Sequence, residues 1–87
     1  MTKTVFTLPG AESLTRSRAA EIVQAASRFE AHLMIELGQR IVNAKSVLGL
    51  LSLSNSEKRE AALVADGSDE EEASRTLLAM LAGEAQP

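Results

Sequence analysis

The sequence contains no cysteine, tryptophan or tyrosine, and only one histidine and two phenylalanines among its 87 residues. Without cysteine the chain has no disulfide and no thiolate metal site, and one histidine does not build a metal site alone. The scarcity of aromatic side chains argues against nucleic-acid binding by base stacking, and the net charge of −3 argues against an electrostatic footprint for nucleic acid. We therefore expect no metal, no cofactor and no direct contact with nucleic acid.

Long apolar segments are also missing. No run approaches the roughly 18 residues that a membrane-spanning helix requires, and the N-terminus lacks the pattern of a signal peptide. With 45% hydrophobic and 24% charged residues, the composition is that of a globular chain. The length predicts a single domain over residues 1–87 with one thin aliphatic core. We expect a cytoplasmic protein that does not bind membranes.

The spacing of apolar residues predicts four elements in the first half of the chain. Alternating apolar and polar residues are typical of half-buried strands, and apolar residues at i, i+3, i+4 and i+7 are typical of an amphipathic helix. The predicted elements are a strand over Thr2–Leu8 closed by Pro9-Gly10, a helix from about Thr15 to Arg28 or Phe29, and strands over Ala31–Leu37 and Arg40–Ala44 joined by Gly38-Gln39. Ser13, Thr15 and Ser17 each suit the N-cap of the helix, so its start stays open.

The second half adds a short helix, a strand and a longer helix. The predicted elements are a helix after Ser46, a strand over Ala61–Ala65, a turn at Asp66-Gly67, and a helix with the apolar stripe Ala73, Leu77, Met80 and Leu81 that ends at Gly83. Ser68 and Glu71 have the spacing of a capping box. The order β-α-β-β-α-β-α with short connections predicts an α/β (α+β) open-faced sandwich. In it, three helices cover one face of a four-stranded antiparallel sheet.

Ser46 stands directly before this short and unusually apolar helix. A serine there is a good N-cap, because its hydroxyl accepts an otherwise unpaired backbone N–H. A phosphate on Ser46 would lie at a helix N-terminus, where negative charge is favoured, with Lys45 beside it. Ser46 could be only a cap, but the two roles are compatible, since one residue can cap first and be modified later.

The apolar residues after Ser46 cover an arc of roughly 220° around the helix, wider than the single stripe that faces a core. One edge of the arc should therefore face a partner. The expected buried members are Leu50 and Leu53, and the expected partly exposed members are Val47, Leu48 and Leu51. The alternative is that all five are buried in this aromatic-poor core.

These residues resemble the HPr family, the histidine-containing phosphocarrier proteins of the bacterial sugar phosphotransferase system. The resemblance runs from about Lys3 to about Leu81 and is most specific over Val42–Leu53, which looks like the regulatory-serine motif of the family. Val23–Phe29 and Ala65–Glu70 add support. The resemblance implies the same β-α-β-β-α-β-α sandwich that the periodicity predicts.

The active-site motif of the family, Gly-(Ile/Leu)-His-(Ala/Thr)-Arg-Pro-Ala, is degraded here. Ser13–Ala19 reads Ser-Leu-Thr-Arg-Ser-Arg-Ala, so Thr15 replaces the phosphate-accepting histidine. Ser17 replaces the arginine that steadies the phosphate, and Arg18 replaces the proline that starts the helix. Because a threonine phosphate is a stable ester, we expect phosphorelay activity to be lost and Thr15 to act as a solvent-facing cap. Arg16 or Arg18 could still attract an anion at this helix N-terminus.

The resemblance implies a non-enzymatic, regulatory role like that of Crh (catabolite repression HPr), a branch of the family without the active histidine. An HPr kinase/phosphorylase would phosphorylate Ser46, and the phosphorylated form would dock on a LacI-type catabolite control repressor. Lys45, Val47, Leu48 and Leu51 would form the partner-binding surface. Crh keeps the arginine that this chain replaces with Ser17. Either Arg16 or Arg18 therefore compensates, or the partner differs.

Two other functions stay open at this point. The chain could be a phosphocarrier that uses a non-standard acceptor, or a constitutive interaction module that dimerises by strand exchange, as Crh-like relatives can. Two further features have simpler interpretations. His32 falls on the outward face of its strand, which argues against a catalytic or metal-binding role. The acidic run Asp69–Glu72 could attract a cation, but it suits the first turn of a helix better.

Overall fold

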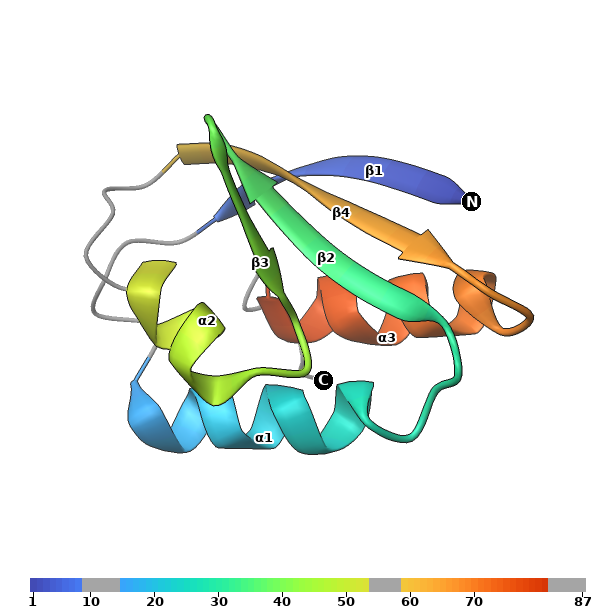
Figure 1. Cartoon of the computed structure of the whole chain (residues 1–87), viewed down its shortest axis with the longest axis horizontal. Coiled ribbons are helices and arrows are strands. Elements are labelled where there is room, and N and C mark those ends of the chain that lie inside the picture. The colour runs from blue at the N-terminus through green and yellow to red at the C-terminus, as the bar shows by residue number, and fades with distance from the viewer. Residues whose placement is uncertain (9–14, 54–58, 82–87) are drawn as a thin grey trace.

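The computed structural model describes residues 1–8, 15–53 and 59–81, which form one sheet with helices on one side (Figure 1). Its elements are β1 (Thr2–Leu8), α1 (Arg16–Ala26), β2 (His32–Leu37), β3 (Arg40–Asn43), α2 (Val47–Ser52), β4 (Arg59–Asp66) and α3 (Glu70–Leu81). The order β-α-β-β-α-β-α within these ranges confirms the predicted fold class. The predictions for Pro9-Gly10, Ser13 and Gly83 lie outside the described residues.

The four strands form an antiparallel sheet in the order β1-β4-β2-β3. Gly38 has φ 63°, which glycine adopts without steric cost, so Gly38-Gln39 closes the predicted two-residue hairpin between Leu37 and Arg40. β4 lies between β1 and β2, and the helices lie together on one face of the sheet (Figure 1). Among the described elements, no helix covers the opposite face of the sheet.

The core lies between the sheet and the helices and is aliphatic, as the composition requires. β2 shows the predicted alternation, because Leu33, Ile35 and Leu37 are buried while His32 is exposed. The largest fully buried side chains are Ile22, Leu33, Ile35, Leu37, Leu50, Leu53, Leu63 and Leu77. The strands and the helices therefore both contribute branched aliphatic side chains to the core.

Several predicted boundaries are wrong by one to three residues. β2 begins at His32 and not at Ala31, and β4 ends at Asp66 and not at Ala65. α1 ends at Ala26, because the N–H groups of Arg28 and Phe29 bond the carbonyls three residues before them and so leave the α-helical pattern. β3 ends at Asn43, one residue early. β4 begins at Arg59, before the predicted Ala61. Arg59 and Glu60 lie outside the apolar pattern, but their backbone still pairs with β1.

The predicted capping box between Ser68 and Glu71 is wrong, and a different set of contacts starts α3. The Glu70 carboxylate accepts the N–H of Gly67 at 3.0 Å, and the Ser68 hydroxyl donates to Glu30 at 3.3 Å. Asp69 reaches across to the connection between α1 and β2. The predicted first-turn acidic residues are confirmed, since α3 opens with three glutamates.

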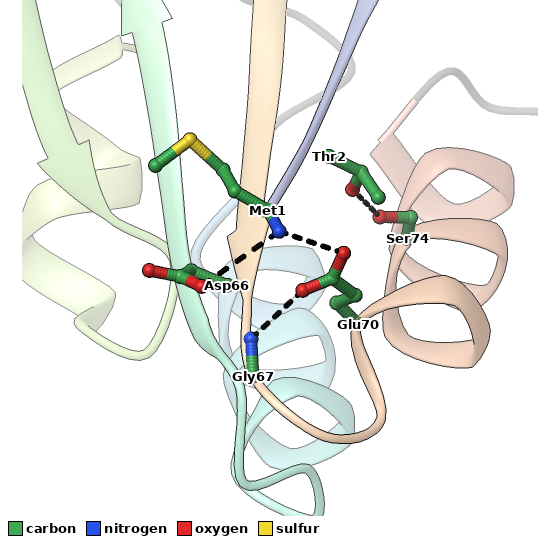
Figure 2. Close-up of polar contacts among 6 residues, drawn as sticks. All are labelled: Met1, Thr2, Asp66, Gly67, Glu70 and Ser74. Atoms are coloured by element: carbon green, nitrogen blue, oxygen red, sulfur yellow. Dashed lines mark hydrogen bonds and ion pairs between the residues drawn. The ribbon is translucent and has the colours of Figure 1, made fainter.

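The same end of α3 also holds the start of β1 (Figure 2). The Met1 amino group lies 2.9 Å from the Glu70 carboxylate and 3.9 Å from that of Asp66. The hydroxyls of Thr2 and the buried Ser74 lie 3.0 Å apart. The hydrogen bond from Gly67, reinforced by the Met1 amino group, lowers the pKa of Glu70. These contacts therefore hold the start of β1, an edge strand, against the N-terminal end of α3.

Asp69 makes folding stability depend on pH. Its two carboxylate oxygens accept the backbone N–H groups of Glu30 and Ala31, each at 2.9 Å. These bonds, that from Glu30 first, lower the pKa of Asp69. The ionised carboxylate therefore stabilises the fold above its unfolded pKa of about 4, and this contribution is lost as pH falls through the lower folded pKa.

We expect Asp69→Asn to lower the urea midpoint at pH 7, because an amide nitrogen would face one of the two N–H donors. The variant should also lose much of the decline in stability between pH 5 and pH 2 that the parent shows. Urea unfolding across that range measures both effects. Glu71→Gln is the control, since Glu71 is an exposed carboxylate in the same turn. Parallel pH profiles for the parent and Asp69→Asn would contradict this account.

Candidate functional site

Ser46 lies at the corner where the chain leaves β3 and enters α2. Its backbone is extended, and its hydroxyl oxygen accepts the N–H of Gly49 at 3.0 Å. The Ser46 carbonyl accepts the N–H of Leu50 at 3.0 Å, which begins the helical pattern. The predicted N-cap is confirmed. The side chain is only partly buried, so its hydroxyl stands near the surface at the start of a helix.

The corner is fixed by short-range contacts on both sides of Ser46. The Ser46 N–H donates to the Asn43 carbonyl at 3.0 Å, and the Asn43 side chain accepts the N–H of Lys45 at 2.8 Å. Gly49 lets α2 approach closely, because a Cβ on it would lie 3.2 Å from the Asn43 carbonyl oxygen. The position of the Ser46 hydroxyl is therefore set by backbone geometry.

Lys45 is not free beside Ser46. Its ammonium group donates to the carbonyl of Phe29 at 2.8 Å, in a partly buried contact that closes the α1–β2 connection. The sequence predicts a cation next to a phosphate on Ser46. The structure instead gives Lys45 an acceptor 16 residues away, for which a phosphate would have to compete.

The apolar residues of α2 divide between core and surface as predicted. Leu50 and Leu53 are 0% and 1% exposed, whereas Leu48 is 80% exposed. Val47 and Leu51 are partly buried and pack against the core. We call Val47, Leu48 and Leu51 the α2 surface. Its exposure agrees with the sequence, and its role in binding stays a prediction.

Thr15 is the N-cap of α1. Of the predicted candidates, the structure describes Thr15 and Ser17, and it is Thr15 that caps the helix. Its hydroxyl oxygen accepts the N–H of Arg18 at 3.1 Å, and its side chain is exposed. Within the described ranges, no histidine or carboxylate is hydrogen-bonded to this hydroxyl to activate it. His32, the single histidine, lies exposed at the start of β2. Thr15 is a solvent-facing cap.

The two arginines beside Thr15 have different surroundings. Arg18 donates through Nη2 to the carbonyl of Met80 at 2.8 Å and pairs through Nη1 with Glu21 at 3.4 Å. It therefore supplies the cation that α3 lacks in its own last turn. Sequence reasoning missed this contact, although the absence of a basic residue there was a signal. Arg16 and Ser17 are exposed, and the Arg16 guanidinium has no hydrogen bond or ion pair to a residue that the structure describes.

Neither a metal-binding cluster nor a membrane-spanning helix is found within the described ranges. In 1–8, 15–53 and 59–81, no group of three or more histidine, aspartate or glutamate side chains is placed to hold a metal ion. No helix within those ranges has the length and apolar character needed to cross a bilayer. The features that point to a function are therefore Ser46, the α2 surface and the exposed start of α1.

A family model described as the PTS HPr component phosphorylation site matches residues 3–83. Among curated proteins, the chain is similar to the HPr-like protein Crh of Bacillus subtilis, with 46% identity over 61 residues, or 70% of this chain and 72% of that protein. It is also similar to the HPr-like protein Crh of Halalkalibacterium halodurans, with 41% identity over 63 residues, or 72% and 75% of the two chains.

Solved structures of the same kind superpose on the fold. HPr-C-His from Thermoanaerobacter tengcongensis gives a TM-score of 0.81 at 34% identity, with 93% of this chain and 91% of that chain covered. Crh from Bacillus subtilis gives 0.76 at 39% identity, with 92% and 88% covered, and is described as a domain-swapped, intertwined dimer.

Proposed function

The chain belongs to the HPr family, and from that premise we propose that it is a non-enzymatic regulatory member of the Crh kind. In this proposal an HPr kinase/phosphorylase phosphorylates Ser46 in the cytoplasm. The phosphorylated chain then acts by binding another protein in carbon catabolite regulation. The names of its relatives and the match to the family's phosphorylation-site model support this role.

The observation that carries the proposal is the position of Leu48 relative to Ser46. Leu48 is 80% exposed and stands in the first turn of the helix that the Ser46 hydroxyl caps. A phosphate on Ser46 would add a charge of about −1.5 to −2 and strong acceptor oxygens beside this apolar side chain. A partner pocket that combines an arginine with apolar residues would engage both at once.

The partner that the family resemblance implies is a LacI-type catabolite control repressor. The proposal is tested by titrating that repressor with the chain before and after phosphorylation on Ser46. We expect the phosphorylated form to bind at least about tenfold more tightly, because charge-assisted hydrogen bonds exceed neutral ones. Equal affinities of the two forms would overturn the proposal.

The alternative phosphocarrier role has no support in the site, because Thr15 offers only an exposed hydroxyl. A homodimer is compatible with the proposal. β1 is an edge strand that pairs only with β4 in the part of the chain described, and Crh of Bacillus subtilis is a swapped dimer. The regulatory role does not depend on that state.

Leu48→Asp should separate binding from folding. Because Leu48 is exposed, we expect the substitution to change the free energy of unfolding by no more than about 0.5 kcal/mol. We also expect it to weaken repressor binding by the Ser46-phosphorylated chain by about tenfold or more, since it would place a carboxylate against the apolar part of the partner pocket. Calorimetric titration and urea unfolding measure the two effects.

Leu50→Ala is the contrasting variant on the same helix. It empties a fully buried position and should cost about 2–5 kcal/mol of stability. If Leu48→Asp left the affinity unchanged, the α2 surface would not be the binding site.

A further inference from the structure

The connection between α1 and β2 is held by side chains from two other parts of the chain. In Figure 1 it lies at the same end of the molecule as the turn between β4 and α3. Just before α3, the Asp69 carboxylate accepts the N–H groups of Glu30 and Ala31, each at 2.9 Å. At the corner before α2, the Lys45 ammonium group donates to the Phe29 carbonyl at 2.8 Å. The α1–β2 connection therefore joins that corner to the start of α3.

Lys45 and Asp69 bind the two ends of the same peptide group. The Phe29 carbonyl and the Glu30 N–H belong to one peptide bond, so a cation holds its oxygen and an anion holds its N–H. Hydrogen bonds in such a chain polarise and strengthen one another. The hydrogen bond from Glu30 is the largest cause of the lowered pKa of Asp69, and the charge of Lys45 adds to it. Loss of either contact should therefore weaken the other.

Lys45 is the member of this chain of contacts that can change its partner. Its backbone is fixed, because the Asn43 side chain accepts its N–H at 2.8 Å and the Asn43 carbonyl accepts the N–H of Ser46 at 3.0 Å. Its ammonium group, however, stands at the end of a flexible four-carbon stem. Asp69 is bonded through both carboxylate oxygens, and its carbonyl accepts the N–H of Ala73 in α3. A competing anion at the corner would therefore move Lys45 and not Asp69.

We propose that Lys45 exchanges partners when Ser46 is phosphorylated: its ammonium group leaves the Phe29 carbonyl and pairs with the phosphate. This inference rests on the proposed function. Lys45 directly precedes Ser46, so the flexible side chain starts one residue from the phosphate. The Phe29 carbonyl is a neutral acceptor, whereas a phosphate carries a charge of about −1.5 to −2. The ion pair therefore adds a Coulombic attraction that the carbonyl does not offer.

This exchange carries the state of Ser46 to the α1–β2 connection. Once Lys45 has left, the Phe29 carbonyl lacks its donor and the Glu30 N–H is less polarised, so the bonds to Asp69 open more often. Phosphorylation thus changes the chain at the corner and also loosens a segment that joins α1, β2 and the start of α3. Because Lys45 neutralises part of the phosphate, the partner protein has to supply only the remaining positive charge.

Hydrogen exchange of backbone amides in the full chain tests the inference. When Ser46 of the parent is phosphorylated, the amides of Glu30 and Ala31 should exchange at least about fivefold faster relative to the amide of Leu63. Leu63 lies in β4, which is paired on both sides in the sheet, so its amide reports global unfolding. The ratio of the two rates therefore separates local opening from a change in overall stability.

Lys45→Met should reproduce this effect without a phosphate, because methionine keeps an unbranched stem and lacks the ammonium group. In the unphosphorylated chain we expect it to accelerate exchange of the Ala31 amide by about fivefold or more. Added to Asp69→Asn, the same substitution should accelerate that exchange by less than about twofold, since the shared contacts are already weakened. Lys3→Met is the matched control, because Lys3 pairs with Glu36 at 3.1 Å within the sheet, and it should stay within about twofold of the parent.

The outcomes distinguish this inference from the proposed function. If phosphorylation of Ser46 tightens repressor binding but leaves exchange of the Glu30 and Ala31 amides unchanged, Lys45 does not exchange partners and the proposed function stands. The same conclusion follows if Lys45→Met exchanges as the parent does. If phosphorylation accelerates exchange at these amides without changing repressor binding, the inference stands and the proposed function fails. If the kinase does not phosphorylate Ser46, both fail.

Discussion

Replacing Gly67 with alanine is expected to destabilise the protein by about 3 kcal/mol, because the added methyl group enters occupied space. A Cβ on Gly67 would lie 2.6 Å from the Cα and 3.0 Å from the Cβ of Ala31. The φ angle of Gly67, 157°, is also one that residues with a side chain rarely adopt. Steric overlap and backbone strain therefore add at one position.

The surroundings of Gly67 leave little room to relax. Ala31 is completely buried, and its N–H and that of Glu30 are both held by the Asp69 carboxylate at 2.9 Å. In the same connection, Lys45 donates to the carbonyl of Phe29 at 2.8 Å. To admit a methyl group, the turn before α3 would have to move away from the α1–β2 connection and break these bonds.

Urea unfolding measures the loss, and Gly38→Ala is the control. Gly38 also has a positive φ, but a Cβ there meets nothing within 4 Å. Alanine at position 38 should therefore cost only the conformational term, about 1 kcal/mol. Equal stabilities of the two variants would show that overlap with Ala31 does not cause the destabilisation.

The features that the sequence predicts correctly are those governed by near neighbours. The Gly38-Gln39 hairpin follows from one glycine between two alternating runs. The cap at Ser46 and the contrast between Leu50 and Leu48 follow from a serine before an apolar arc wider than one stripe. Each of these features depends on residues that are close in the sequence, so tertiary packing does not change it.

The features that the sequence does not reveal join segments that are distant in the chain. Asp69 bonds residues 38 and 39 positions away, Lys45 bonds Phe29, and Arg18 bonds Met80, which lies 62 positions away. Each of these side chains has a plausible local role, as helix cap or as phosphate ligand. Tertiary packing offers each of them a backbone partner instead.

Ser46→Ala is expected to abolish phosphorylation by an HPr kinase/phosphorylase with ATP, while the parent chain takes up one phosphoryl group. The hydroxyl of Ser46 is the acceptor that the proposed function requires, and it stands near the surface. Intact-mass measurement reads the change directly. Ser52→Ala is the matched control, because Ser52 is a partly buried serine of the same helix whose hydroxyl donates to the Gly49 carbonyl at 2.6 Å. It should be modified as the parent is.

Ser46→Ala also removes a structural contact, so loss of binding alone would not prove a switch. The Gly49 N–H loses its acceptor, which should lower stability by about 1 kcal/mol. Ser46→Asp restores an acceptor at the N-cap and should recover most of that stability. It supplies less charge and fewer oxygens than a phosphate, so repressor binding should stay well below that of the phosphorylated parent. If binding instead followed stability across these variants, or if Ser46→Ala were phosphorylated as readily as the parent, Ser46 would be only the cap of α2.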